Sequence, residues 1–295
     1  MLTIKNVDTF IGKKKIIKKA SFEIESGSIV GLIGPNGAGK TTVMKTILGL
    51  TKFTGEISLD NKKVTENDHE ALQEVGALIE HPAIYPFLTG RQNLTLYSKD
   101  VSDVNKIISI LEMQSYINRK SKTYSLGMKQ KLGIAIALCN HPKLIILDEP
   151  MNGLDIESTI LIRNIIKQYA EEGCAFLISS HILSELQKVM TKIILISDGK
   201  IILDKSIDEF NKNESDLYRI MTTDNIKAKN LLTVNGFNIQ VVDGKVIIDK
   251  SDLINMQKIL YGNGISLLEL THESLSFESK IVKLLSNQGD DLNVK

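Results

Sequence analysis

The sequence lacks several features that would point to particular classes of protein. It has two cysteines in 295 residues, Cys139 and Cys174, and each lies within an apolar run. We expect both to be buried small hydrophobic side chains in a reducing compartment, and not a disulfide or a metal site.

Long apolar runs are also missing. No stretch reaches the roughly 18 consecutive apolar residues that a membrane-spanning helix needs. The first residues, MLTIKNVD, lack the basic start and apolar core of a signal peptide. We therefore expect that the chain does not span a membrane, and that another chain supplies the membrane part of any membrane process it serves.

Charge of one sign is not in excess. Lysine and arginine number 36 against 35 acidic residues, a net charge of +1, which favours neither a nucleic-acid partner nor an acidic substrate. One run is locally basic, and we interpret it as the solvated face of a hairpin in preference to a membrane or nucleic-acid patch. Its lysines are Lys13, Lys14, Lys15, Lys18 and Lys19. The overall composition, 42% hydrophobic and 24% charged, is typical of a globular protein.

Short apolar runs alternate with helical patterns over the first two thirds of the chain. Residues 1–25 predict strands, residues 28–33 form an apolar run before a glycine-rich turn, and TTVMKTILGL has helical spacing. Residues 68–140 predict mostly helix and polar loop. Further buried strands are expected at 144–147, 175–178 and 193–196, with an amphipathic helix at STILIRNIIKQYA. This alternation predicts an α/β fold with a largely parallel sheet covered by helices on both faces.

The pattern changes after about residue 212. A polar linker, NKNESD, is followed by the order strand, helix, strand, strand, helix, strand, with a turn expected at Asp243-Gly244. This order suggests a small α+β unit of the ferredoxin-like kind. A last helix is expected at SFESKIVKLLSN, and the final residues are expected to fray. We predict two domains, 1–212 and 213–295, of which the first contains a helical subdomain at about 82–140.

A glycine-rich segment, GPNGAGKTT, fits the pattern G-x-x-x-x-G-K-[ST] between a predicted strand and a predicted helix. Such a loop wraps a triphosphate with backbone N–H groups, the helix N-terminus adds partial positive charge, the lysine reaches the β- and γ-phosphates and the first threonine ligates Mg²⁺. The predicted nucleotide-binding residues here are Gly34, Pro35, Asn36, Gly37, Ala38, Gly39, Lys40, Thr41 and Thr42.

Two acids end the apolar strand LIILDEP. Asp148 fits a Mg²⁺ ligand, acting through water, and Glu149 fits the general base that polarises the attacking water. Acids at strand ends also serve as helix caps, but the phosphate-binding loop upstream favours the catalytic interpretation. The predicted metal ligands are therefore Thr41 and Asp148.

Three further segments follow in a fixed order, and together they identify a family. Tyr124–Met128, YSLGM, resembles the LSGGQ signature of ATP-binding cassette (ABC) proteins, Asn152–Asp155 resembles their D-loop, and His181 their switch histidine. The resemblance covers about residues 2–210. It implies a P-loop cassette in which Ser125 and Gly127, at a helix N-terminus, contact the γ-phosphate of ATP held by a second ATPase chain. It also implies that His181 is catalytic, although a lone histidine is more often structural.

Two positions depart from the family pattern. The aromatic that stacks on adenine aligns with Ile11, one residue after Phe10, and we favour Phe10 as the stacking residue after a local shift. The Q-loop glutamine aligns with Glu80, which the resemblance makes a Mg²⁺ ligand and a catalytic residue. The alternative is that Glu80 is a solvated acid in a loop and has no ligand role.

Glu80 and the segment that follows it resemble the ATPases of bacitracin resistance and lantibiotic immunity, and exporters of amphipathic peptide toxins are similar in the same way. The resemblance implies ATP and Mg²⁺ as cofactors, integral membrane permease subunits as partners, and a peripheral location on the cytoplasmic face of the membrane. The second ATPase chain makes a homodimer or a paralogous heterodimer, and no nucleic acid is expected. The alternative function is a soluble ABC-type ATPase acting on a target such as the ribosome; a P-loop kinase or GTPase is opposed by the three family segments.

Overall fold

The computed structural model describes residues 1–212, 217–242, 245–272 and 276–290. The chain divides into two compact units, Met1–Phe210 and Asn211–Lys295, and each has its own hydrophobic core. Most of the expected linker, the turn at Asp243-Gly244 and the last residues lie outside the described residues. Within the described parts of the chain, no helix is both long enough and apolar enough to cross a bilayer.

A six-stranded sheet in the order β10-β9-β3-β8-β7-β6 forms the centre of the first unit. The strands are β3 (Ile29–Ile33), β6 (Val75–Leu78), β7 (Leu144–Asp148), β8 (Ala175–Ser179), β9 (Lys192–Ser197) and β10 (Lys200–Ser206). All neighbours pair in parallel except β9 and β10. Every residue of β3, β7 and β8 is buried, as expected for strands covered on both faces. The predicted parallel sheet is confirmed.

A second sheet in this unit is antiparallel, in the order β2-β1-β4-β5. Its strands are β1 (Leu2–Ile11), β2 (Lys14–Ile24), β4 (Lys52–Leu59) and β5 (Lys62–Lys63). One apolar core joins both sheets to helix α1 (Lys40–Ile47). The five lysines from position 13 to position 19 lie exposed on the predicted β1–β2 hairpin.

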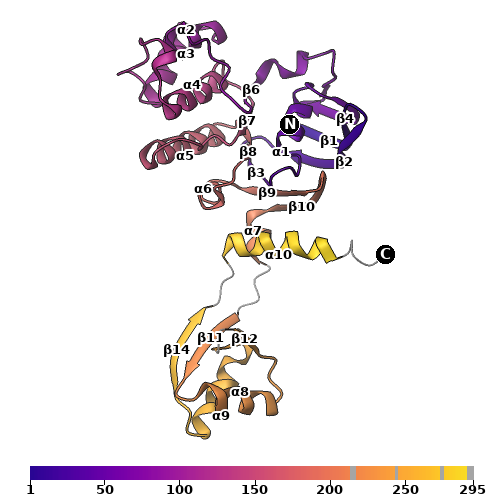
Figure 1. The fold of residues 1–295 in the computed structure, drawn as a ribbon, viewed down its shortest axis with the longest axis vertical. Helices are drawn as coiled ribbons and strands as arrows, with labels where there is room; N and C mark the ends of the chain where they lie inside the picture. Colours follow the sequence, from indigo (N-terminus) through magenta and orange to yellow (C-terminus); the bar gives the residue numbers. More distant parts are fainter. Residues whose placement is uncertain (213–216, 243–244, 273–275, 291–295) are drawn as a thin grey trace. The chain divides into compact units, whose positions relative to one another are not determined.

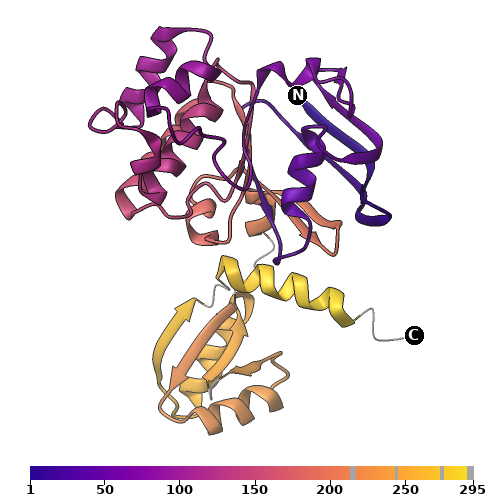
Figure 2. The same cartoon turned by 45° about the horizontal axis from the view of Figure 1, so that its top comes forward.

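The remaining helices of the first unit include a group, α2 to α4, on the side of the central sheet away from the antiparallel strands (Figures 1 and 2). The helices are α2 (Gly90–Tyr97), α3 (Val101–Ile110), α4 (Leu126–Leu138), α5 (Ile156–Glu171), α6 (Leu183–Gln187) and α7 (Ile207–Lys212), with 3₁₀ turns η1 (Glu70–Glu74) and η2 (Ser121–Thr123). Helix α2 begins with a capping box between Thr89 and Gln92.

Strand β6 is absent from the sequence prediction, which gave residues 68–140 as helix and loop and is wrong there. Val75–Leu78 pairs in parallel with β7 at the edge of the sheet. The run VGAL has no alternation of apolar and polar residues, and periodicity cannot tell such a short run from a buried helix segment. The strand packs tightly on α4, since a Cβ at Gly76 would lie 1.8 Å from the carbonyl oxygen of Ala137.

The second unit contains a four-stranded antiparallel sheet in the order β12-β13-β11-β14. Its elements are β11 (Leu217–Thr222), α8 (Asn225–Val234), β12 (Gln240–Val242), β13 (Lys245–Asp249), η3 (Lys250–Asp252), α9 (Leu253–Gly262), β14 (Leu267–His272) and α10 (Phe277–Asp290). Strands and helices from β11 to β14 follow the ferredoxin-like order. Residues of α8 and α9 share a core with β11 and β13.

The two cysteines are free and buried. Burial raises the pKa of each thiol, Cys139 and Cys174, to about 12. Both are therefore protonated thiols in the folded protein, and their predicted burial is confirmed.

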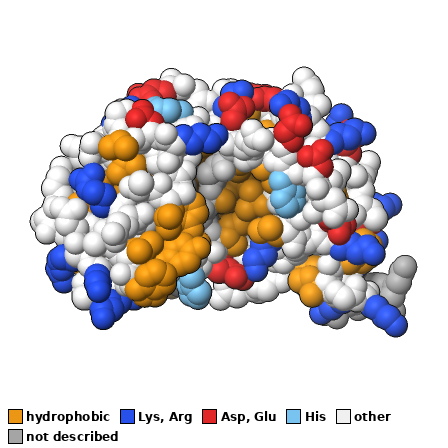
Figure 3. Space-filling model, turned by 90° about the horizontal axis from the view of Figure 1, so that it is seen from above, with side chains coloured by type: hydrophobic (Ala, Val, Ile, Leu, Met, Phe, Trp, Pro, Cys, Tyr) orange, Lys and Arg blue, Asp and Glu red, His pale blue; other side chains and the backbone are white. Residues whose placement is uncertain are grey.

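A groove of about 340 Å³ follows the exposed edge of β6. Its apolar walls come from β6, α4 and the end of α1, and include Leu50, which is 62% exposed. Figure 3 shows a hollow with hydrophobic side chains on the face seen from above. The first unit therefore presents apolar surface in a concave position.

Candidate functional site

The phosphate-binding loop joins β3 to α1 and needs its glycines for space and for backbone conformation. A Cβ at Gly34 would lie 2.2 Å from the carbonyl oxygen of Ile196, and one at Gly39 would lie 2.6 Å from Ile17 Cδ1. Gly39 also has a φ of +108°, which side-chain-bearing residues rarely adopt. The loop therefore runs directly into the N-terminus of α1, a favourable position for an anion.

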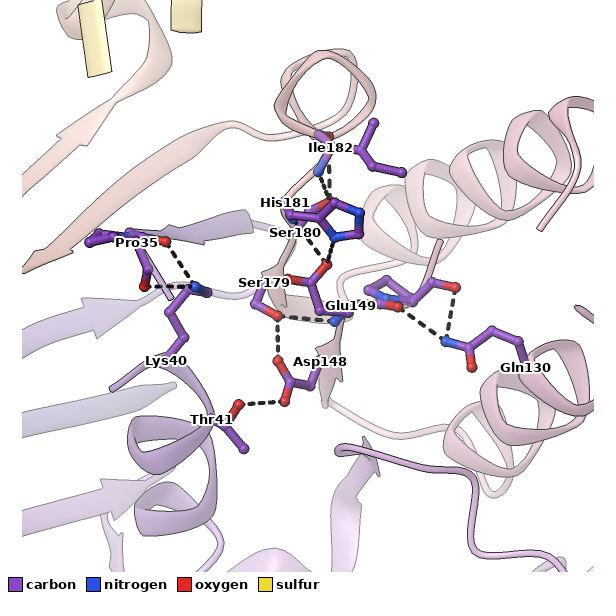
Figure 4. Close-up of polar contacts among 12 residues, drawn as sticks. Pro35, Lys40, Thr41, Gln130, Asp148, Glu149, Ser179, Ser180, His181 and Ile182 are labelled. Atoms are coloured by element: carbon purple, nitrogen blue, oxygen red, sulfur yellow. Dashed lines mark hydrogen bonds and ion pairs between the residues drawn. The ribbon is translucent and has the colours of Figure 1, made fainter. Parts of the chain in front are cut away.

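The lysine of the loop turns back over it. Lys40 Nζ donates to the carbonyl oxygens of Gly34, at 2.8 Å, and Pro35, at 3.2 Å (Figure 4). Ala38 is buried, whereas Asn36 and Gly37 are exposed and Thr42 is half-buried. The ammonium group is thus held at the loop, in a position to meet phosphate oxygens.

A chain of hydrogen bonds joins α1 to the ends of β7 and β8. Thr41 Oγ1 donates to Asp148 Oδ2 at 2.7 Å, and Ser179 Oγ donates to Asp148 Oδ1 at 2.5 Å (Figure 4). Asp148 and Ser179 are register partners, and Asp148 is only 7% exposed. The structure thus brings together two of the three residues predicted to hold Mg²⁺, Thr41 and Asp148, which lie 107 positions apart in the sequence.

The candidate base lies beside the candidate switch histidine. One carboxylate oxygen of Glu149, Oε2, accepts the backbone N–H of His181 at 3.0 Å and lies 2.6 Å from His181 Nδ1. The Glu149 N–H donates to Ser179 Oγ at 3.0 Å. The Glu149 side chain is 25% exposed, so that water can reach the carboxylate.

The signature segment caps a helix, as predicted. Ser125 is the N-cap of α4, and its Oγ accepts the N–H of Met128 at 3.2 Å. Gly127 lies against the D-loop, since a Cβ there would be 2.9 Å from the carbonyl oxygen of Gly153. Among the hydrogen bonds of the described residues, none joins Ser125 or Gly127 to the phosphate-binding loop of the same chain.

Glu80 follows β6 and pairs with a lysine on α1. Its Oε1 lies 2.7 Å from Lys45 Nζ, and this partner holds the pKa of Glu80 below its usual value. Lys45 is one helical turn after Thr41, so both side chains lie on the same face of α1. The structure therefore pairs Glu80 with the face of α1 that also carries Thr41.

The candidate adenine-stacking residues differ in their surroundings. Lys15 Nζ lies 5.6 Å from the centre of the Phe10 ring. Ile11 is 57% exposed. Stacking of a base on the face of Phe10 that Lys15 covers would therefore require Lys15 to move.

Three residues of the site were not identified from the sequence: Ser179, Gln130 and Lys45. Ser179 could have been found, because it ends the buried strand that precedes His181. Gln130 donates to the backbone carbonyls of Glu149 and Pro150 from α4, and no sequence spacing indicates that contact. No sequence spacing indicates the contact between Lys45 and Glu80 either, since these residues lie 35 positions apart.

The fold and this arrangement define a P-loop nucleoside triphosphatase. A phosphate-binding loop opens a helix beside a buried aspartate, and a glutamate follows that aspartate. A family model described as ABC transporter matches residues 17–152.

Relatives extend this match over almost the whole chain. The chain is 32% identical to the bacitracin transport ATP-binding protein BcrA of Bacillus licheniformis, over 93% of this chain and 94% of the relative. It is 40% identical to the lantibiotic transport ATP-binding protein SrtF of Streptococcus pyogenes, over 70% of this chain and 92% of the relative. The chain therefore belongs to the ATP-binding proteins of ABC transporters, which hydrolyse ATP.

The fold is similar to that of a solved ABC transporter cassette. The dimeric structure of a bacterial ABC transporter cassette is 27% identical, with a TM-score of 0.63 over 70% of this chain and 99% of that chain. The predicted P-loop cassette fold is therefore confirmed.

Proposed function

We propose that this chain couples ATP binding and hydrolysis to the export of, or immunity to, a peptide such as a lantibiotic or a bacitracin-like antibiotic, through separate membrane subunits. The observation that carries the enzymatic part is the hydrogen-bonded series from Thr41 through Asp148 and Ser179 to Glu149. Similarity to the two transport proteins supports the choice of cargo.

In this proposal each side chain acts on one part of the reaction. The loop N–H groups and Lys40 hold the β- and γ-phosphates. Glu149 polarises the attacking water as general base, and His181, in contact with the Glu149 carboxylate, orients it near the γ-phosphate. The reaction transfers the γ-phosphoryl group from ATP to water, giving ADP and phosphate.

The residues present fit a Mg²⁺ ion bound together with the nucleotide. Mg²⁺ is usually held by one or two carboxylates, a hydroxyl and the substrate phosphates, with water completing the shell. Thr41 and Asp148 offer one hydroxyl and one carboxylate. Within the described residues, no group of three or more histidine, cysteine or acidic side chains could hold a metal alone. Such an ion would neutralise charge on the phosphates.

We propose that the working unit is a dimer, either of two copies or of this chain and a paralogue. Ser125 and Gly127 stand at the N-terminus of α4, where N–H groups attract an anion, yet they make no hydrogen bond to this chain's own loop in the described part of the molecule. Partner-held ATP is the anion that completes this arrangement. The relative solved as a dimer supports the proposal.

A loop beside the β6 groove is suited to contact the membrane subunit. Tyr85 and Phe87 are 47% and 65% exposed. The loop backbone is fixed, because the buried Asn93 side chain bonds both the N–H and the carbonyl oxygen of Tyr85. Exposed aromatics on a fixed backbone favour a partner surface over packing onto the helical subdomain.

Tyr85→Ala together with Phe87→Ala should weaken assembly with the permease and leave ATP binding intact, because both rings point to solvent. Co-purification with the membrane subunits and nucleotide affinity of the isolated chain measure the two effects. Leu96→Ala with Val101→Ala is a matched control, since both side chains are also exposed apolar groups. Normal assembly with a less stable isolated subunit would mean that the rings serve the subunit's own fold.

We expect Glu80 to link the nucleotide to this loop. Mg²⁺–ATP beside Thr41 would attract the carboxylate away from Lys45, whereas the γ-phosphate and Glu149 repel it. Glu80→Ala should keep nucleotide binding and lose transport-dependent resistance, and Glu80→Gln should be milder.

Loss of the Lys45–Glu80 pair by itself should cost little stability, because the two side chains are 33% and 57% exposed. Glu70→Ala breaks another exposed pair, with Lys62, and is the control. Full resistance in cells that express Glu80→Ala at the normal level would exclude the coupling role.

The proposed function as a whole is tested by purification from membranes. A tagged chain should co-purify with an integral membrane protein, at the cytoplasmic face of the membrane, and the complex should hydrolyse ATP. Recovery with ribosomes and without any membrane protein would support a soluble ABC-type ATPase instead.

A further inference from the structure

Gln130 joins the signature helix to the candidate base. It lies one turn into α4 and is only 7% exposed. Its Nε2 donates to the successive carbonyl oxygens of Glu149 and Pro150, each at 3.1 Å (Figure 4). A single buried amide therefore spans the contact between the helix that Ser125 caps and the backbone that carries the Glu149 carboxylate.

The backbone at Glu149 needs such support. Its φ of +52° lies in the left-handed region, which is unfavourable for a residue with a side chain and persists where surrounding contacts hold it. The Glu149 N–H donates to Ser179 Oγ, and its carbonyl oxygen accepts from Gln130 and from the Asn152 N–H at 3.2 Å. Of these three contacts, Gln130 supplies the one that comes from α4.

We propose that Gln130 is a positioning residue that transmits the position of α4 to Glu149. The inference rests on the proposed dimer, in which the tip of α4 meets ATP held by the partner. Binding of that ATP fixes α4, and Gln130 then fixes the peptide from which the Glu149 carboxylate projects toward the chain's own nucleotide. Close packing of Gly127 on Gly153 moves the D-loop with the same helix. ATP bound in one site thereby positions Glu149, the catalytic base, in the other site.

Gln130→Met tests the contact, because it keeps the length of the side chain and removes both donors. We expect kcat to fall about tenfold, less than the roughly 10²-fold that a 1 Å misplacement can cost, with the Kd for ATP changed by less than about twofold. Gln168→Met on α5 is the matched control. Its amide is exposed and, among the hydrogen bonds of the described residues, bonds only Glu172 one turn away, so kcat should not change.

A double variant separates positioning from a structural role. In a Glu149→Gln background the base is gone, so Gln130→Met should reduce the residual turnover no further, and the ATP-bound dimer should still accumulate. A second tenfold loss in that background, or wild-type kcat in folded Gln130→Met, would overturn the inference. Gln130→Asn, whose amide is one methylene too short to reach both carbonyls, gives the same test if the methionine variant does not fold.

Failure of the proposed function would give different experimental results from failure of the Gln130 inference. The chain with all its native residues would then form no ATP-dependent dimer, or Glu149→Gln alone would hydrolyse ATP normally. Either result overturns the dimer mechanism, and the inference about Gln130 with it.

Discussion

Glu149→Gln should bind ATP and hydrolyse it at least about 10²-fold more slowly, because general-base catalysis contributes about 10²–10⁴-fold. The glutamine keeps the shape of the side chain and an oxygen that can accept the His181 N–H, now at 3.0 Å, but it cannot take a proton from water. ATP should therefore remain in place, and an ATP-bound dimer should accumulate in size-exclusion chromatography.

Glu171→Gln is the control for this substitution, because Glu171 is an exposed residue at the end of α5. It should leave both turnover and oligomeric state unchanged. Normal hydrolysis by Glu149→Gln, with the protein monomeric in ATP, would show that Glu149 is not the base.

Lys40→Ala should weaken ATP binding or turnover by a large factor. The substitution removes the cation that offsets phosphate charge and also the two bonds from Nζ to the loop carbonyls of Gly34 and Pro35. Equilibrium binding of a fluorescent ATP analogue and steady-state hydrolysis measure the two effects. Charge-assisted hydrogen bonds to ligand oxygens are about twice as strong as neutral ones. Removing Lys40 should therefore weaken ATP binding more than removing any single backbone N–H contact of the loop.

Lys106→Ala provides the comparison, since Lys106 is an exposed lysine on α3. That variant should bind and hydrolyse ATP normally. Near-normal ATPase activity in Lys40→Ala would contradict the assignment of the phosphate-binding loop.

The sequence predicted the elements whose pattern is local. The phosphate-binding loop, the strand ending in Asp148 and the helix capped by Ser125 depend on short runs with strong periodicity or special residues, and the structure has each of them. Strand β6 was missed because four residues at a sheet edge carry no period, and it is held by packing on α4.

Contacts that depend on tertiary packing were beyond the sequence pattern. Gln130 reaches Glu149 because α4 packs on the end of β7, and Lys45 reaches Glu80 because β6 ends beside α1. Polar residues on helices are ordinarily solvated, so neither was singled out. The resemblance placed Glu80 at the metal, whereas in this structure its carboxylate pairs with Lys45, and a ligand role stays a prediction.

The central claim is that each active site combines Lys40 of one chain with Ser125 of another. Mixing differently tagged Ser125→Arg and Lys40→Ala chains, each inactive alone, tests it most directly in a homodimeric assembly. A mixed dimer then has one site with both lesions and one with neither, so that ATP hydrolysis should recover in proportion to the mixed dimers captured through both tags. Mixed dimers that form but hydrolyse no more ATP than either variant alone would contradict the account.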